Sequence, residues 1–362
     1  MSTLFTTPRR TLAGAIALAV GSLLLASCAA APTPASTTAA DVPSDFLPCI
    51  VSDSGGFNDN SFNALGLQGV TDAAKKLGVK HIDVQSNTES DYALNISSLI
   101  DQGCSVIVAT GYLLAAATKE AAAANPDVNF IIIDDNSIDA PNVKPILFDT
   151  SQSGYLVGYA AASYTKTGKV GTFGGANIPP VTLYMDGFAD GVARYNKDKG
   201  TDVKVIGWDL KTQEGQFTGN FTDINAAKVL SQTLLDQGAD IILPVGGPIY
   251  QGTAEAIRDA GGENEMLGVD ADMYEMAPKY SDMILTSIAR DMPLSISTVI
   301  EADAAGDFTK DQYIGTLENG GVTISPFHDF EDKVAPTLAG ELDALKAGII
   351  DGSIVVDSPS KP

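Results

Sequence analysis

Short runs of β-branched and aromatic residues alternate with helical stretches along most of this chain. Such alternation predicts parallel βαβ units, in which each helix crosses back over the sheet. Two series of this kind follow one another, which indicates two lobes. Runs such as FIIID and DIILPV are apolar throughout, as expected of strands that helices cover on both faces.

The expected elements can be given by range. Strands of the first series are expected at 47–52, 81–85, 105–109, 130–134 and 145–148, with helices at 61–77, 92–102 and 115–124. Strands of the second series are expected at 169–173, 204–209, 241–244, 266–269 and 283–287. A helix around 341–347 and a strand-like run at 349–356 should pack across one lobe or the hinge.

The first residues have the pattern of an export signal. Arg9 and Arg10 precede an apolar run, 11–27, that is short for a membrane span and ends in small residues. The run stops at Leu-Ala-Ser-Cys28, which looks like a bacterial lipobox. We therefore expect a signal peptide at 1–27, a lipid on Cys28, and a flexible tether at 28–46 that is rich in Ala, Thr, Pro and Ser. An ordinary secretory signal with an incidental cysteine is the alternative.

Length and charge limit the possible architectures and partners. Removal of residues 1–27 from the 362 leaves 335, which is more than one hydrophobic core usually holds. The same removal takes away two arginines and no acid, so the net charge of −23 becomes −25. A chain this acidic should repel nucleic acid and anionic lipid head groups. We expect a monomeric body, held to the membrane only through its lipid.

Two cysteines remain besides Cys28. Cys49 and Cys104 stand at the start of apolar runs that should form neighbouring parallel strands, with their N-terminal ends side by side. An extracytoplasmic compartment permits a disulfide between them. We expect this bridge; two buried free thiols are the alternative.

Polar residues follow the first strand. In open α/β sheets, ligands bind beyond the carboxyl ends of the strands, so these residues are candidates for a site. The loop 53–63 contains glycines and polar groups and should also cap the next helix, a role that could be its only one. Its sequence fits D-x-G-G-x-x-D-x-S-F-N, and here the chain resembles the basic membrane protein family of ABC-transporter binding lipoproteins, which includes purine-nucleoside receptors.

The resemblance recurs in order along the chain, at segments 130–135, 174–179, 219–223, 246–247, 268–272 and 286–287. It implies the type I periplasmic-binding-protein fold, an α/β architecture of two doubly wound parallel-sheet lobes joined by a multi-strand hinge. The first lobe would comprise 47–165 and about 286–325, the second 166–285 and about 326–362. Chain crossings are then expected near residues 165, 285 and 325.

The resemblance also implies a ligand site between the first lobe and the second. Phe62 and Phe221 would sandwich a planar base, because aromatic faces stack and exclude water. Asp134 would accept hydrogen bonds from the base, and Asp53 and Asn63 would add polar contacts. Core packing for either phenylalanine, and helix capping or loop bracing for Asp53 and Asn63, are the alternatives.

In the second lobe, the resemblance implies that Asp270 accepts from ribose hydroxyls and that Gly246 and Gly247 let the backbone come close. The chain departs from the family pattern at Arg290, where the family has lysine. A planar guanidinium could still pair with Asp270 and the sugar, or it could prefer a carboxylate or phosphate. Purine nucleoside is the expected ligand class.

Catalytic signals are weak in this sequence. The two histidines, His81 and His328, lie near no GxSxG, HExxH or paired-cysteine motif, and the chain has no Walker loop or GxGxxG. We expect no enzyme activity, cofactor or metal. The expected role is capture of a solute that stabilises the closed hinge state, followed by delivery to a permease and its ATPase. The alternatives are the same fold binding another small polar solute, such as a sugar, and a membrane-tethered sensor.

Overall fold

The structure, a computed structural model, describes residues 42–362. The expected signal peptide, Cys28 and the tether up to residue 41 lie outside the described residues. The tether was predicted to extend to Phe46, and this end is wrong. Phe46, which comes shortly before the first strand, is buried and packs in the main hydrophobic core, so the folded body begins before residue 47.

The first of two large sheets is parallel throughout. Its strands are β1 (Pro48–Val51), β2 (Ile82–Val84), β3 (Val106–Ala109), β4 (Asn129–Ile133), β5 (Val143–Phe148) and β13 (Tyr313–Gly315). They lie in the order β13-β5-β4-β3-β1-β2. The five strands expected in the first series are all present.

The second large sheet repeats this plan. Its strands are β6 (Lys169–Gly174), β7 (Lys204–Ile206), β10 (Ile241–Val245), β11 (Glu265–Asp270), β12 (Ile284–Arg290) and β14 (Val322–Ile324), in the order β14-β12-β11-β10-β6-β7. Only β14 runs antiparallel among these pairs. In both sheets the first strand lies between the second and the third, so each has a switch point where ligands bind in doubly wound folds.

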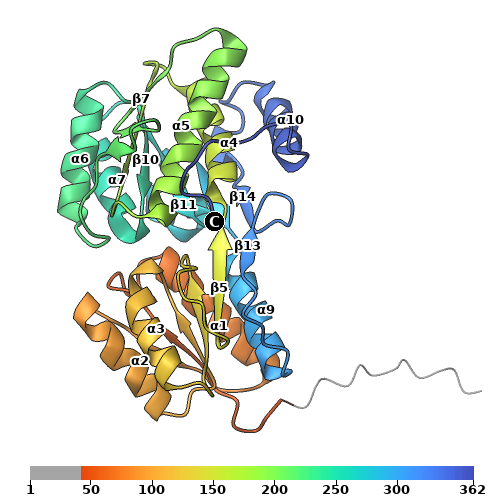
Figure 1. Cartoon of the computed structure of the whole chain (residues 1–362). Helices are drawn as coiled ribbons and strands as arrows, with labels where there is room; N and C mark the ends of the chain where they lie inside the picture. Colours follow the sequence, from red (N-terminus) through yellow and green to blue (C-terminus); the bar gives the residue numbers. More distant parts are fainter. Residues whose placement is uncertain (1–41) are drawn as a thin grey trace, which may run out of the picture. The chain divides into compact units, whose positions relative to one another are not determined.

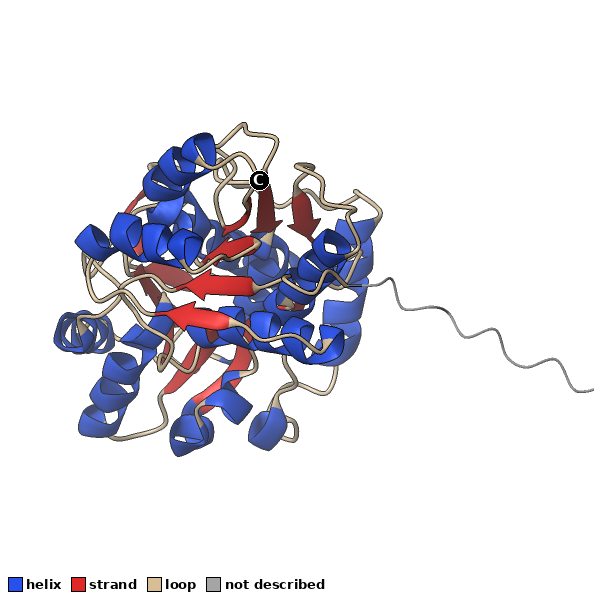
Figure 2. Cartoon of the chain, turned by 90° about the horizontal axis from the view of Figure 1, so that it is seen from below, coloured by secondary structure: helices blue, strands red, loops and turns tan. Residues whose placement is uncertain are grey.

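Helices cover both faces of each sheet, as Figure 2 shows from below. On the first sheet, α1 (Phe62–Leu77) and α9 (Met292–Ala304) pack on one face, and α2 (Tyr92–Asp101) and α3 (Ala115–Ala124) on the other. On the second sheet, α4 (Thr150–Tyr164) and α5 (Pro179–Lys199) lie opposite α6 (Ile224–Asp236) and α7 (Tyr250–Ala260). In Figure 1, α9 lies beside α1 although the two are far apart in sequence.

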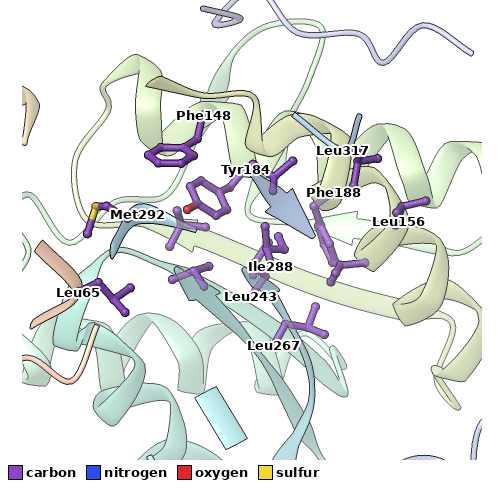
Figure 3. Packing of buried hydrophobic residues seen from close by; sticks show 14 of the residues in the cluster. Leu65, Phe148, Leu156, Tyr184, Phe188, Leu243, Leu267, Ile288, Met292 and Leu317 are labelled. Atoms are coloured by element: carbon purple, nitrogen blue, oxygen red, sulfur yellow. The ribbon is translucent and has the colours of Figure 1, made fainter. Parts of the chain in front are cut away.

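The apolar strands divide their side chains between two cores. In β4, Ile131 and Ile133 join the main cluster, whereas Phe130 and Ile132 join a separate cluster under α2 and α3. This is the period of two expected of a strand that is covered on both sides. Figure 3 shows part of the main cluster, which extends from residues of the first lobe to residues of the second, such as Leu243.

The chain passes between the sheets three times, and these crossings do not fall where they were predicted. α4 packs against α5 and β12, so the first crossing comes after β5, at Asp149, and not near 165. β12 stays in the second sheet up to Arg290, where it pairs with β14, so the second crossing is at Asp291 and not near 285. The third lies between β13 and β14, before residue 325. The predicted lobe boundaries therefore shift accordingly.

Two strand predictions near the ends of elements are wrong. The expected strand 204–209 is interrupted at Gly207, whose φ of 94° turns the chain, and the rest forms β8 (Trp208–Asp209), paired with β9 (Glu214–Gly215). The strand-like run 349–356 is not a strand. It begins inside α10 (Leu338–Ile350), which packs against α4, and continues as a turn and irregular backbone.

The two cysteines of the described chain are joined. Cys49 in β1 and Cys104, just before β3, form a disulfide with their Cα atoms 5.9 Å apart. The parallel pairing of β1 with β3 places these positions side by side at the edge of the sheet opposite the carboxyl ends of the strands. The bridge is therefore remote from the switch point.

Candidate ligand-binding cleft

The two switch points face one another across a pocket. Its empty volume is about 580 Å³, including its opening to solvent, which is in the range of small-molecule sites. All nine residues predicted to bind ligand line it: Asp53, Phe62, Asn63, Asp134, Phe221, Gly246, Gly247, Asp270 and Arg290. The residues predicted from the sequence therefore lie together at one pocket, to which both lobes contribute.

The loop after β1 is braced by its own polar side chains. Asp59 accepts hydrogen bonds from the backbone N–H groups of Ser61, Asn63 and Ala64, so it caps the start of α1. Asn63 donates through Nδ2 to Asp53 Oδ1 at 2.7 Å and accepts from the Asp53 N–H at 3.0 Å. Loop bracing, one of the two alternatives for Asn63, is therefore what its contacts show.

Asp53 keeps one oxygen available to the pocket. Its Oδ1 accepts from Asn63 and from the Gly55 N–H at 2.8 Å, whereas its Oδ2 has no hydrogen-bond partner among residues 42–362. Burial raises the pKa of Asp53 to about 6, against the hydrogen bonds from Asn63 and Gly55, which lower it. A carboxyl with a free oxygen and a shifted pKa in a pocket is a candidate for ligand recognition.

Arg290 lines the pocket and pairs with two of the acids that line it. Its Nη1 donates to the two oxygens of Asp134 at 2.9 and 2.8 Å, and its Nε donates to Asp270 Oδ1 at 3.0 Å. The side chains of all three are at most 8% exposed. Burial opposes the charge on Arg290, but Asp134 and Asp270 outweigh it and raise the pKa of the guanidinium. The expected departure at this position thus creates a buried ion-pair triad.

The triad connects the two lobes. Asp134 follows β4 of the first sheet, whereas Arg290 ends β12 and Asp270 ends β11 of the second. Both aspartates have positive φ, 64° for Asp134 and 72° for Asp270. Non-glycine residues rarely adopt this conformation, and such strain gathers at functional sites. The assigned contacts of Asp134 with a base and of Asp270 with a sugar therefore compete with Arg290.

Two further residues complete the surroundings of Asp270, and the sequence reasoning missed both. Ser61, from the first lobe, donates through its hydroxyl to Asp270 Oδ2 at 2.7 Å. Tyr184, from α5, donates to Asp270 Oδ1 at 3.0 Å and is buried. Tyr184 carries no local signal, because it stands among apolar helix residues and its pattern is that of core packing. Ser61 lies inside the loop 53–63 that the sequence marks as a candidate, but its hydrogen-bond partner, Asp270, belongs to the other lobe.

Each phenylalanine lies against a glycine that follows the third strand of its own sheet. A Cβ at Gly111, after β3, would come within 3.0 Å of the Phe62 ring, and a Cβ at Gly246, after β10, within 2.6 Å of the Phe221 ring. These glycines have φ of 119° and 138°. The expected close approach at Gly246 is therefore made by Phe221. The two rings line one pocket from opposite lobes, and the glycines behind them occupy corresponding positions in the two sheets.

The rings and the triad are adjacent. The guanidinium carbon of Arg290 lies 4.9 Å from the centroid of the Phe62 ring and 5.3 Å from that of Phe148, both within the range of cation–π attraction. A planar guanidinium stacks in this way more readily than the ammonium of a lysine. The substitution of arginine at position 290 therefore fits an environment of rings as well as of carboxylates.

Residues 47–350 match the protein family described as ABC transporter substrate-binding protein PnrA-like. The chain belongs to this family, the Bmp family. Among Bmp relatives, the ABC transporter nucleoside-binding protein BmpA of Lactococcus lactis is 30% identical over 342 residues, which cover 90% of this chain and 92% of that protein. Basic membrane protein A of Borreliella burgdorferi is 27% identical over 315 residues, which cover 84% of this chain and 86% of that protein. The resemblance seen in the sequence is confirmed.

Solved structures support the Bmp fold as one of solute-binding proteins. A solute-binding protein of an ABC transporter system from Aeropyrum pernix K1 has a TM-score of 0.78 at 24% identity, covering 87% of this chain and 94% of that one. A second, from Conexibacter woesei, has a TM-score of 0.67 at 23% identity, with coverage of 88% and 100%. The type I periplasmic-binding-protein fold is thereby confirmed. The family match and the curated relatives show the role, which is that of an ABC transporter substrate-binding protein.

Two further features, a metal-binding cluster and a membrane-spanning helix, are absent from the part of this Bmp chain that the structure describes. Residues 42–362 contain no group of three His, Cys, Asp or Glu side chains arranged to hold a metal ion. None of the helices in this range has the length and apolar character needed to cross a bilayer. His328 pairs with Asp272 at 2.7 Å and stacks on Tyr274 away from the pocket.

Proposed function

We propose that this chain captures purine nucleosides in the cleft between its lobes and delivers them to an ABC permease and its ATPase. The observation that carries this proposal is the pair of phenylalanines, Phe62 and Phe221, one from each lobe, each held against a glycine of its own sheet. Flat rings on both sides of a pocket suit a planar heterocycle, which stacks on aromatic faces. The Lactococcus lactis relative is named as a nucleoside-binding protein, which agrees with this ligand class.

Asp53 is the acceptor that we assign to the base. Its Oδ2 accepts no hydrogen bond from residues 42–362, whereas the oxygens of Asp134 and Asp270 are occupied by Arg290, Ser61 and Tyr184. Purines such as guanine and hypoxanthine carry ring N–H groups that can donate a hydrogen bond to a carboxylate. The sugar hydroxyls would then lie against the triad of Asp134, Arg290 and Asp270, and would replace some of the hydrogen bonds within it.

The charges in the pocket favour a nucleoside over a nucleotide. Among the residues that the structure describes, three carboxylates, Asp53, Asp134 and Asp270, face a single cation, Arg290, which is already paired with two of them. A phosphate brought into this surplus of negative charge would be repelled. We therefore expect guanosine 5′-monophosphate to bind at least about tenfold more weakly than guanosine.

Calorimetric titration tests the proposal. Guanosine, inosine and adenosine, free purine bases, guanosine 5′-monophosphate and simple sugars would be titrated into the purified chain. Binding of nucleosides is expected, with weaker binding of free bases, which lack the sugar. A flat response to every nucleoside would end the proposal, and binding of sugars alone would favour the same fold acting on another solute.

The pH dependence of binding tests the role of Asp53. Because its pKa is about 6, the carboxylate is present at neutral pH and is protonated at lower pH. Affinity for inosine should fall as the pH drops below about 6, by up to about tenfold per pH unit, since protonation removes the acceptor. The Asp53→Asn variant should bind more weakly at pH 7.5 and show no such fall. An affinity that stays constant from pH 7.5 to 5 in the unaltered chain would exclude this role.

The same pKa has the opposite effect on folding. An acid whose pKa is higher in the folded chain than in the unfolded one stabilises the fold at low pH, and this contribution is lost as the pH rises through the folded value. For Asp53 the window runs from about 4 to 6. Asp53→Asn should therefore be more stable at neutral pH while it binds less, and thermal melting reports this separately from binding.

We also propose that Cys28 carries a lipid that anchors the protein at the outer face of the cell membrane. The support is the lipobox pattern of the sequence and the extracytoplasmic location of ABC substrate-binding proteins. Cells that express the chain should incorporate a palmitate analogue into it, and Cys28→Ala should abolish this labelling. A Cys49→Ala variant is the matched control and should remain labelled. Labelling that survives Cys28→Ala would exclude this anchor.

A further inference from the structure

The last six residues of the chain, 357–362, run along α5 and are called the tail here. Three polar contacts attach it: the Asp357 N–H donates to Asp190 at 3.0 Å, the Ser358 hydroxyl donates to Asp186 at 2.6 Å, and the hydroxyls of Ser360 and Thr182 lie 2.7 Å apart. Positions 182, 186 and 190 are four residues apart and therefore form one ridge of the helix. The tail follows this ridge toward the N-terminal end of α5.

Asp186 is the most deeply buried of the three residues of α5 that hold the tail. It is fully buried, and its two oxygens accept from three donors: Trp208 Nε1 at 2.9 Å, Gln213 Nε2 at 2.8 Å and the Ser358 hydroxyl. A buried carboxylate is costly unless such donors surround it. Ser358 is therefore part of a satisfied polar cluster, and the tail is fixed to the body at this point.

Beyond Ser358 the tail leads to the side of the ligand cleft. Pro359–Pro362 line a second pocket whose opposite wall includes Asn136 and Phe148 of the first lobe, with an empty volume of about 720 Å³ including its opening to solvent. Tyr112, Asp134 and Pro180 line both this pocket and the ligand pocket. The two are thus adjacent chambers. Figure 1 shows the end of the chain beside the arrowhead of β5, where the first crossing begins.

We propose that the tail is a wall of the binding site: it covers one side of a chamber next to the Asp134–Arg290 pair and slows the loss of bound solute. The tail is attached to the second lobe and faces residues of the first, so the chamber has both walls only when the lobes are together. Without the tail, more water would reach Asp134 from this side and weaken its attraction to Arg290. The retention of solute rests on the function proposed above.

A chain that stops after Ser358 provides the first test and needs no ligand. It keeps the bond from Ser358 to Asp186 and lacks the wall. Hydrogen exchange of the segment 134–137 should be about threefold faster or more than in the full chain, because the segment loses its cover. Trp208, the only tryptophan, should keep its emission, since Asp186 keeps its donors. Val355→Ser, at a position 78% exposed, is the control and should change neither signal.

Ser358→Ala tests the attachment. It removes one donor from Asp186, so the emission of Trp208 should shift, and the exchange of 134–137 should rise as in the shortened chain. In stopped-flow measurements, inosine should dissociate about fivefold faster from both variants, with little change in the association rate. Dissociation within twofold of the full chain, together with unchanged exchange in the shortened chain, would overturn the proposal. If the full chain binds no nucleoside, the proposed function fails while the exchange measurement still decides whether the tail is a wall.

Discussion

Replacing Arg290 with methionine should lower the free energy of unfolding by about 3–5 kcal/mol at pH 7, because two buried carboxylates lose their cation. Asp134 and Asp270 would each lose charge-assisted hydrogen bonds of 2.8–3.0 Å. The loss should be smaller at pH 5, because burial raises the pKa of Asp134, and Arg290, which lowers this pKa, would be gone, so the carboxylate can take up a proton. Chemical denaturation at the two pH values measures this effect.

Two matched substitutions separate the triad from the general effect of a lost charge. Arg258 is 42% exposed in its side chain and lies 3.7 Å from Asp282, so Arg258→Met should cost less than about 1 kcal/mol. Arg290→Lys keeps the charge, yet an ammonium cannot donate in a planar fork to two carboxylates, so an intermediate loss is expected. Equal stability of Arg290→Met and the unaltered chain would show that the triad contributes nothing net to the fold.

Removal of either ring of the proposed sandwich should weaken nucleoside binding by about tenfold to a hundredfold. Stacking on an aromatic side chain contributes about 1–3 kcal/mol per base, and each factor of ten is 1.4 kcal/mol. Phe221→Ala and Phe62→Ala would each be titrated with guanosine and inosine. Phe62 also lies against Arg290, so its replacement should affect stability more than that of Phe221.

Controls distinguish stacking from simple apolar contact. Phe221→Leu keeps apolar volume without a ring, so it should lose most of the affinity that alanine loses. Phe308, a partly buried phenylalanine outside the ligand pocket, serves as a matched site, and Phe308→Ala should leave affinity unchanged. Full affinity in both Phe62→Ala and Phe221→Ala would exclude the sandwich.

The strands and first helices were predictable because their signals are local. The apolar run of β4 and the helix α3 were found within a residue of their ends. The crossings were not predictable, because the membership of an element in one lobe depends on which helix it meets. α4 follows the first series in sequence and packs with the second, and no property of its residues announces this.

The site was predictable as a set of residues and less so as a set of roles. Glycines and acids after strands marked the pocket, and the family pattern selected nine residues that line it. Their hydrogen-bond partners come from other parts of the chain. Ser61 reaches Asp270 across 209 positions and Arg290 reaches Asp134 across 156. Local sequence does not indicate such pairs. That the carboxylate oxygens of Asp134 and Asp270 already accept hydrogen bonds from other side chains is therefore seen only in the structure.

The three crossings between the lobes are also bonded to one another. The Asp149 N–H donates to the Gly315 carbonyl at 2.8 Å, and the Asp291 N–H donates to the Gly321 carbonyl at 2.9 Å, so the third crossing is tied to the first and to the second. Three short connections fastened in this way should resist sliding and twisting of one lobe against the other. We therefore expect rotation about these connections to be the easiest relative motion of the lobes, so that one angle would describe it.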